Sequence, residues 1–227
     1  MNGEDRAMTS KVRAMTSEDL IAALARDVRP VPRYGLVQRL GLGIGAGALV
    51  TLIAVGGWLG FRPDLMPAMH GATFWIKWTY TISLAICATV ATLRLARPDG
   101  RVGGWLRLMI VPVLGLAAIA IAELATTPRG DWLALWLGDS WTVCSRNVFV
   151  LAVPIFVGLL WSFRRLAPTR LALAGMTAGM AAGAWGATLY CLHCPETSAL
   201  FVLTWYTLGM VAVAALGAIV GPRLLRW

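Results

Sequence analysis

Six long apolar stretches constrain this chain more than any other feature. Crossing a hydrocarbon core of about 30 Å takes roughly 20 apolar residues in a helix, and lipid offers the backbone few other ways to satisfy its hydrogen bonds. The stretches lie near residues 40–61, 71–93, 108–127, 145–163, 171–191 and 198–220. We therefore expect an all-α integral membrane bundle of six transmembrane helices, in a domain that covers residues 40–227.

The few charged residues predict how these helices are oriented. Only 14% of the residues are charged, and basic residues in short membrane loops are retained on the cytoplasmic side. Sixteen of the 20 basic residues lie before the first stretch, after the second, after the fourth or in the tail. The others are Arg62, Lys77, Arg129 and Arg146. Both termini are therefore expected in the cytoplasm, and the connections near 62–70, 128–144 and 192–197 on the opposite side.

We interpret the net charge of +9 first as a signal of this orientation. A protein that binds DNA directly usually carries a basic face on a soluble domain, and the sequence contains no such domain. We therefore expect no direct DNA binding, and the lipid bilayer is the first partner that the composition predicts.

Residues 1–39 precede the first stretch and carry no signal-peptide pattern, so they are expected to remain as a cytoplasmic segment. Thr16 and Asp19 have the spacing of a capping box. An apolar stripe follows at helical spacing, formed by Leu20, Ile21, Leu24 and Val28. The pattern predicts a helix near 17–28 that ends before Pro30, because a proline disfavours helix in the residue before it. This helix either lies on the inner leaflet or docks on a cytosolic partner.

Small residues recur every fourth position in two stretches, which predicts close contacts between helices. The rows are Gly175, Gly179 and Gly183 in the fifth stretch, and Gly41 with Gly45 and Gly43 with Gly47 in the first. They leave open whether the contacts lie within one bundle or between the copies of a homo-oligomer.

Reactive side chains are concentrated between the last two stretches, in a segment that contains Cys191, His193, Cys194 and Glu196. Cys191 and Cys194 have the spacing of the redox pair of a thiol-disulfide oxidoreductase. Alternatively, Cys144 and Cys194 lie at matching depth and form a disulfide or share a soft metal with His193, with Cys191 and Glu196 as auxiliary groups. A constitutive disulfide between loops is the structural alternative.

The four cysteines differ in their expected positions relative to helix ends, and therefore in how readily they ionise. Cys144 opens the fourth stretch, and the residues after Cys194 suit the first turn of a helix, which predicts Cys194 at the cap of the sixth. A helix N-terminus stabilises a thiolate, and Arg146 is expected to add to this effect at Cys144. The other two thiols are at less favourable positions, the end of the fifth stretch for Cys191 and mid-membrane for Cys87.

Four segments of the chain carry a resemblance to a known family: Thr16 to Val31, Gly60-Phe61-Arg62-Pro63-Asp64-Leu65, His193 to Phe201, and Arg223-Leu224-Leu225-Arg226-Trp227. In these segments the chain resembles the NrsF-type membrane anti-sigma factors, and the resemblance covers it from Met15 onward. Members of that family are six-span proteins of the bacterial inner membrane. They hold an extracytoplasmic-function sigma factor inactive and release it under heavy-metal or oxidative stress through two periplasmic cysteines. The resemblance implies that these cysteines are Cys144 and Cys194.

We therefore predict a regulator that is not an enzyme and needs no cofactor. The resemblance implies a cytoplasmic sigma factor as its partner, bound through the N-terminal segment. The residues expected to bind it are Leu20, Ile21, Leu24, Asp27, Val28 and Pro30. The alternatives are a membrane thiol-disulfide oxidoreductase that uses Cys191 and Cys194, and a small-solute transporter. Ionisable residues are scarce in mid-membrane, which disfavours the transporter.

Overall fold

The computed structural model describes residues 17–26, 34–97, 103–163, 166 and 168–226, and it contains no strand among them. The expected all-α fold class is therefore confirmed. The chain forms two units, residues 1–35 and residues 36–227, and each is described by itself.

The first unit contains one described helix, α2 (Ser17–Arg26), with acidic residues in its first turn and a basic residue in its last, as the helix dipole favours. The side chains of Ile21 and Leu24 are 65% and 63% exposed. Asp27, Val28 and Pro30 lie outside the described residues. A helix of this length is marginal in water by itself, so α2 requires a surface that covers its apolar side chains.

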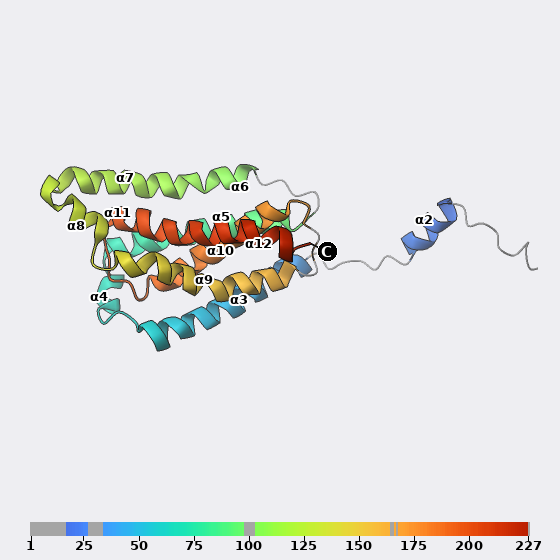
Figure 1. Cartoon of the computed structure of the whole chain (residues 1–227), viewed down its shortest axis with the longest axis horizontal. Helices are drawn as coiled ribbons and strands as arrows, with labels where there is room; N and C mark the ends of the chain where they lie inside the picture. Colours follow the sequence, from blue (N-terminus) through green and yellow to red (C-terminus); the bar gives the residue numbers. More distant parts are fainter. Residues whose placement is uncertain (1–16, 27–33, 98–102, 164–165, 167, 227) are drawn as a thin grey trace, which may run out of the picture. The chain divides into compact units, whose positions relative to one another are not determined.

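The second unit is a bundle of long helices joined by short helical segments (Figure 1). Its long helices are α3 (Gly35–Ala54), α5 (Ala72–Leu95), α7 (Ile110–Thr126), α9 (Trp141–Phe163), α10 (Leu171–Tyr190) and α12 (Thr207–Leu224). The short segments are η1 (Val55–Leu59), α4 (Leu65–Met69), α6 (Gly103–Leu108), η2 (Arg129–Asp131), α8 (Trp132–Leu137), α11 (Ala199–Phe201) and η3 (Val202–Tyr206). Each long helix coincides with one of the predicted apolar stretches.

Five helical stretches of the described residues are long and apolar enough to cross a membrane. They are Gly35–Leu59, Ala72–Leu95, Gly104–Thr126, Arg129–Phe163 and Ala199–Leu224. The sequence predicted six spans, and the stretch near 171–191 is absent from this set. That stretch forms α10, which has 20 residues and no charged side chain. Length and charge therefore do not exclude it, and most of its residues are Gly, Ala and Thr.

Small side chains allow α10 to occupy the centre of the bundle, in contact with α5, α9 and α12. A Cβ atom added at Gly179 would lie 2.9 Å from a Cα atom of α12. In α3, Gly43 and Gly47 meet the backbone of α9 as closely, whereas Gly41 and Gly45 face open space among the described residues. Two of the three glycine rows therefore pack helices within one bundle.

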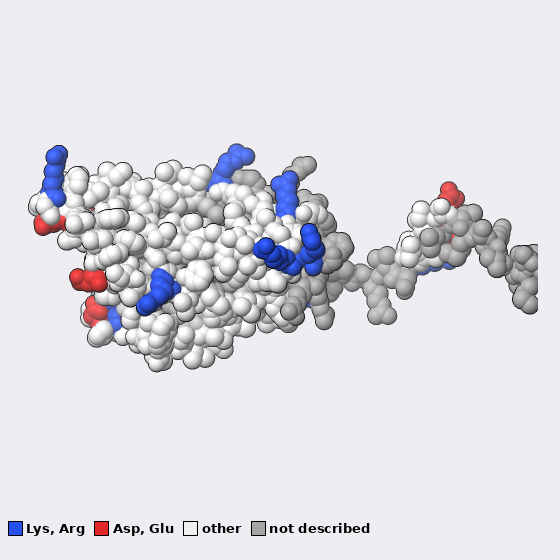
Figure 2. All heavy atoms as spheres, viewed as in Figure 1, with Lys and Arg blue, Asp and Glu red and all other residues white. Residues whose placement is uncertain are grey.

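Charged side chains are distributed unevenly over the bundle (Figure 2). On the face in view, its acidic side chains lie at one end together with some basic ones, and further basic side chains gather at the other end. The acidic end carries α4, α8 and the 191–198 segment, and is here called the loop end. The surface between the two ends is mostly uncharged in this view, as a bundle that crosses a hydrocarbon layer requires.

Candidate functional site

Two thiols from separate segments of the chain meet at the loop end. Cys144 lies in the first turn of α9, where its backbone N–H donates to the carbonyl oxygen of Ser140 at 2.9 Å. Cys194 lies between α10 and α11, and its N–H donates to the carbonyl oxygen of Tyr190 at 3.0 Å. The side chains of Cys144 and Cys194 lie close enough to interact, and both are fully buried. The structure thus brings together the two cysteines that the sequence analysis selected as a pair.

The predicted position of Cys194 at a helix cap is wrong. The last helical stretch begins with α11 at Ala199, and Ser198 is its N-cap, because its hydroxyl accepts the N–H of Phe201 at 3.2 Å. The Glu123 carboxylate on α7 completes this cap by accepting the N–H of Ala199 at 2.9 Å. Cys194 therefore belongs to the preceding loop and does not lie at the start of the last helical stretch.

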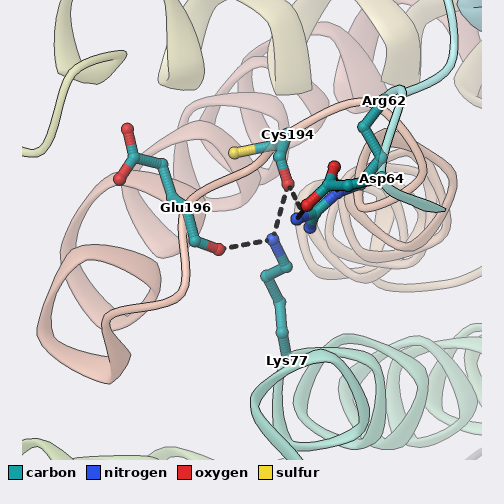
Figure 3. A network of polar contacts seen from close by, with 5 residues as sticks. All are labelled: Arg62, Asp64, Lys77, Cys194 and Glu196. Carbon is teal, nitrogen blue, oxygen red and sulfur yellow. Dashed lines mark hydrogen bonds and ion pairs between the residues drawn. The ribbon is translucent and has the colours of Figure 1, made fainter. Parts of the chain in front are cut away.

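The cation beside the thiols is Lys77, whereas the sequence analysis had assigned Arg146 to this role. Arg146 is exposed on α9, while Cys144 on the same helix is buried. The Lys77 side chain, on α5, is 3% exposed, and its ammonium group donates to the carbonyl oxygens of Cys194 at 3.0 Å and Glu196 at 2.8 Å (Figure 3). A lysine inside an apolar stretch was the signal in the sequence, because a charge there is costly unless it has a function.

These neighbours change the ionisation of Cys194. The interaction with the Cys144 thiol lowers the pKa of the Cys194 thiol, and the positive charge of Lys77 lowers it further. Burial acts in the opposite direction, but the pKa remains below its ordinary value. Because Lys77 and Arg62 both donate to the carbonyl oxygen of Cys194, the surroundings of the two cysteines are unequal.

The two remaining cysteines are not part of this pair. The Cys191 thiol donates to the carbonyl oxygen of Ala187, in its own helix, at 3.2 Å, and is fully buried. Cys87 lies within α5 and is 7% exposed. The spacing of Cys191 and Cys194 therefore does not correspond to a hydrogen-bonded pair of thiols.

The side chains of His193 and Glu196 form hydrogen bonds with groups other than the thiols. His193 Nδ1 lies 2.8 Å from the carbonyl oxygen of Gly60, and Glu196 Oε1 accepts hydrogen bonds from Ser140. Within the described ranges, no group of three His, Cys, Asp or Glu residues is arranged to hold a metal ion. The soft-metal site that the sequence suggested is not assembled, because the contact with Gly60 orients the imidazole toward the segment that follows η1.

Arg62 anchors the same loop from the segment after η1. Its backbone N–H donates to the carbonyl oxygen of Leu192 at 3.1 Å, and its guanidinium group donates to that of Cys194 at 3.5 Å. The guanidinium also pairs with Asp64 at 2.6 Å. This hydrogen-bonded pair lowers the pKa of the Asp64 carboxyl and raises the pKa of Arg62. The sequence analysis counted Arg62 only as a topology signal.

A cavity of about 300 Å³ adjoins this loop, and its wall includes Arg62, Lys77 and Glu196. Neither thiol of the pair lines it. A molecule in the cavity would contact the cations that hold the loop, and would reach the buried sulfur atoms only if the loop moved.

The fold and the site define a helical membrane protein with a buried, asymmetric dithiol held by a network of polar contacts. The chain belongs to the family described as "NrsF: Negative regulator of sigma F", which it matches over residues 24–227. This family is one of regulatory proteins.

Two relatives are similar over almost the whole chain. The chain is 40% identical over 213 residues to the "Probable anti-sigma-F factor NrsF" of Azospira oryzae, and 41% identical over 216 residues to the "Anti-sigma-F factor NrsF" of Caulobacter vibrioides. Each alignment covers 94% of this chain and 100% of the relative. No solved structure matches the chain.

Proposed function

We propose that this protein is a membrane-bound anti-sigma factor with a thiol trigger. It holds an extracytoplasmic-function sigma factor inactive at the cytoplasmic face of a bacterial inner membrane. It releases the sigma factor when Cys144 and Cys194, on the periplasmic side, are oxidised under stress. The observation that carries the proposal is the close approach of these two buried thiols, in a chain whose relatives are named anti-sigma factors.

The proposed topology, with both termini in the cytoplasm, needs α10 as a sixth span. α10 packs along α5, α9 and α12, each of which belongs to a stretch that is apolar enough to cross a membrane. At 1.5 Å per residue, its 20 residues extend about 30 Å. Counting α10 as a span gives an even number, so that both termini lie on one side, and the basic loops orient that side toward the cytoplasm.

The sigma factor is assigned to the segment 16–33, with α2 as its described helical part. Ile21 and Leu24 are exposed at a spacing that helix-in-groove recognition uses. α2 carries two acidic residues and one basic residue. Because the cytoplasmic leaflet is negatively charged, this composition favours a protein groove over the lipid surface. Leu20, Asp27, Val28 and Pro30 extend the proposed contact along the chain.

Oxidation is the trigger that the geometry favours. A pair of thiols that already lie close together needs only a small movement to form a disulfide, whereas a soft metal would need further ligands that the described residues do not supply. Moving a switch from 1:99 to 99:1 takes about 5.5 kcal/mol of differential stabilisation. A new covalent bond in a loop that contacts α5, α9 and the segment after η1 is a suitable source.

The test is retention of sigma factor on membranes. Membranes with the full chain are incubated with tagged extracytoplasmic-function sigma factors of the same bacterium, one at a time, and washed with or without hydrogen peroxide. We expect one sigma factor to be retained and then released by peroxide from the wild type, but not from Cys144→Ser or Cys194→Ser. Cys191→Ser is the matched control, since it removes a buried thiol that bonds within its own helix, and it should respond as the wild type does.

Two results would contradict the proposal. If no sigma factor is retained in reducing buffer, the protein is not an anti-sigma factor of this type. If Cys191→Ser alone abolishes the release, the pairing is wrong, and the vicinal pair of a thiol oxidoreductase explains the site better.

A further inference from the structure

Lys77 is a buried cation for which the described residues supply no carboxylate. Its ammonium group contacts only the carbonyl oxygens of Cys194 and Glu196 in hydrogen bonds, and the ion pair that the described part of the chain contains is Arg62 with Asp64. The Glu196 carboxylate points away from Lys77 (Figure 3). A buried ammonium is costly unless a negative group lies close to it. The Cys194 thiol, whose electrostatic interaction with Lys77 favours the ionised form, can provide that charge.

Two cations distinguish Cys194 from the other buried thiols of the loop end. Lys77 and Arg62 both donate hydrogen bonds to the carbonyl oxygen of Cys194, whereas the thiol of Cys191 donates to the carbonyl oxygen of Ala187. The Tyr206 hydroxyl also lies close to Cys194, and it has no partner of ordinary hydrogen-bond geometry among the described residues. Cys194 is thus the cysteine whose backbone the two cations hold.

We propose that Lys77 makes Cys194 the nucleophile of the pair, that Cys144 is the resolving thiol, and that the oxidant is a small hydroperoxide. The inference rests on the proposed function, because it specifies how the trigger reacts. Lys77 acts as a positioning residue: it holds the backbone of Cys194 by hydrogen bonds, and its charge stabilises the thiolate without contact with the oxidant. A small, uncharged peroxide suits a site in which both sulfur atoms are fully buried.

The chemistry balances as a two-electron oxidation of the dithiol. The Cys194 thiolate attacks one peroxide oxygen, the O–O bond breaks, and hydroxide leaves and takes up the proton that the thiol released. Cys194 is then a sulfenic acid. The Cys144 sulfur attacks the Cys194 sulfur, the S–O bond breaks, and water leaves with the proton of Cys144. Two thiols are oxidised to one disulfide, and hydrogen peroxide is reduced to two waters.

The charge of Lys77 should be visible in a titration of the thiolate. The titratable and charged groups that face Cys194 are Arg62, Lys77, Cys144, Tyr190, Cys191 and Tyr206. Because Lys77 favours the ionised thiol, the thiolate persists to lower pH than in an ordinary cysteine and is lost as the pH falls through the lowered pKa. Removal of the charge should therefore move the titration of Cys194 to higher pH.

The first arm of the experiment identifies the nucleophile. Purified full-length protein with Cys87→Ser and Cys191→Ser is treated with hydrogen peroxide and dimedone, which traps sulfenic acids, and the modified peptide is identified by mass spectrometry. With Cys144→Ser added, we expect the adduct on Cys194. With Cys194→Ser added, Cys144 should give at most about a tenth as much, since a protonated thiol reacts poorly. An equal or larger adduct on Cys144 would overturn the proposal.

The second arm measures thiolate absorbance at about 240 nm against pH in the same two-serine background. Lys77→Met should raise the midpoint by about one pH unit or more, which is a tenfold change in the ionisation constant, while Lys77→Arg should preserve most of the shift. Arg146→Met is the matched control, since it removes an exposed cation near Cys144 in the sequence, and its curve should match the parent. Curves for Lys77→Met and the parent that superimpose would overturn the role of Lys77.

Both arms are independent of the sigma factor. If Lys77 stabilises the Cys194 thiolate but the protein releases no sigma factor, the proposed function is contradicted and this inference stands. If the sigma factor is released by peroxide but dimedone modifies Cys144, this inference is contradicted and the proposed function stands. If Lys77→Met fails to accumulate, the dimedone adduct and the Lys77→Arg titration still decide between the two thiols.

Discussion

The Glu196 carboxylate accepts two hydrogen bonds from Ser140, one from its backbone N–H at 3.0 Å and one from its hydroxyl at 2.9 Å. The carbonyl oxygen of Ser140 in turn accepts the backbone N–H of Cys144, and Glu196 lies two positions after Cys194 in the chain. This clamp therefore connects the loop of one cysteine to the helix start that carries the other. We expect it to help set the distance between the two thiols.

Loss of the clamp should slow formation of the disulfide. Glu196→Ala leaves the Ser140 donors without their acceptor, which costs on the order of 1–3 kcal/mol of stability, and it should lower the rate at which peroxide removes both maleimide-reactive thiols. Glu196→Gln keeps a carbonyl acceptor and should have a smaller effect. Asp131→Ala removes an exposed carboxylate of the same end and serves as control. Oxidation at the wild-type rate in Glu196→Ala would show that the clamp does not position the thiols.

Gly138 allows the Glu196 carboxylate to approach. Its φ is 54°, and a Cβ added there would lie 2.6 Å from Glu196 Oε2. We expect Gly138→Ala to combine backbone strain with displacement of the carboxylate and to lower the free energy of unfolding by about 1–3 kcal/mol. Thermal unfolding in detergent measures this. Gly130→Ala, at a position with open space around it, should be neutral, and equal melting temperatures for the two variants would contradict the prediction.

Glu123 joins α7 to the start of α11, since its Oε2 atom accepts hydrogen bonds from the Ser198 hydroxyl at 3.1 Å and the Ala199 N–H at 2.9 Å. A carboxylate at a helix N-terminus stabilises it by roughly 0.3–1 kcal/mol, and more where it is partly buried. Glu123→Ala should therefore destabilise the protein by about 1–2 kcal/mol, and Glu123→Gln by less, because only the charge is lost. The melting temperatures of the two variants test this prediction. A lower melting temperature for Glu123→Gln than for Glu123→Ala would refute it.

The exposed stripe of α2 should carry affinity for the sigma factor. Truncation of an anchor in a recognition helix commonly costs about 2 kcal/mol or more, roughly a thirtyfold loss of affinity. Ile21→Ala with Leu24→Ala should release the sigma factor without stress at unchanged membrane levels of the variant, and Ala23→Ser, on another face of α2, should not. Full repression by the stable double variant would show that α2 rests on lipid.

The status of α10 as a span can be tested at its two ends. In a background without native cysteines, an impermeant maleimide should label Thr197→Cys and Gly130→Cys in intact cells. It should label Arg170→Cys and Arg223→Cys only after the inner membrane is opened. Labelling of position 170 and position 197 from the same side would mean that α10 does not cross the membrane, and the proposed location of both termini would then fail.

Hydropathy predicted the long helices well, because lipid imposes its requirement on each segment separately. It was less informative for α10, whose glycines and alanines suit contact with other helices better than contact with lipid. The local pattern around Cys194 was misleading, since Pro195 and Glu196 make a good first helical turn. In the structure, Ser198 and Glu123 satisfy the N–H groups that begin the helix further along the chain.

The sequence by itself determined the all-helical class, the positions of the long helices and the cysteines worth comparing, because composition and spacing along one segment are sufficient for these. Only the tertiary structure decided which side chains surround the thiols. Lys77 and Tyr206 come from other segments of the chain than Cys194, and their effects on Cys194 depend on distance and burial in space. A hydrogen bond or a charge acts within a few ångströms, and the order of residues along the chain does not specify which segments approach that closely.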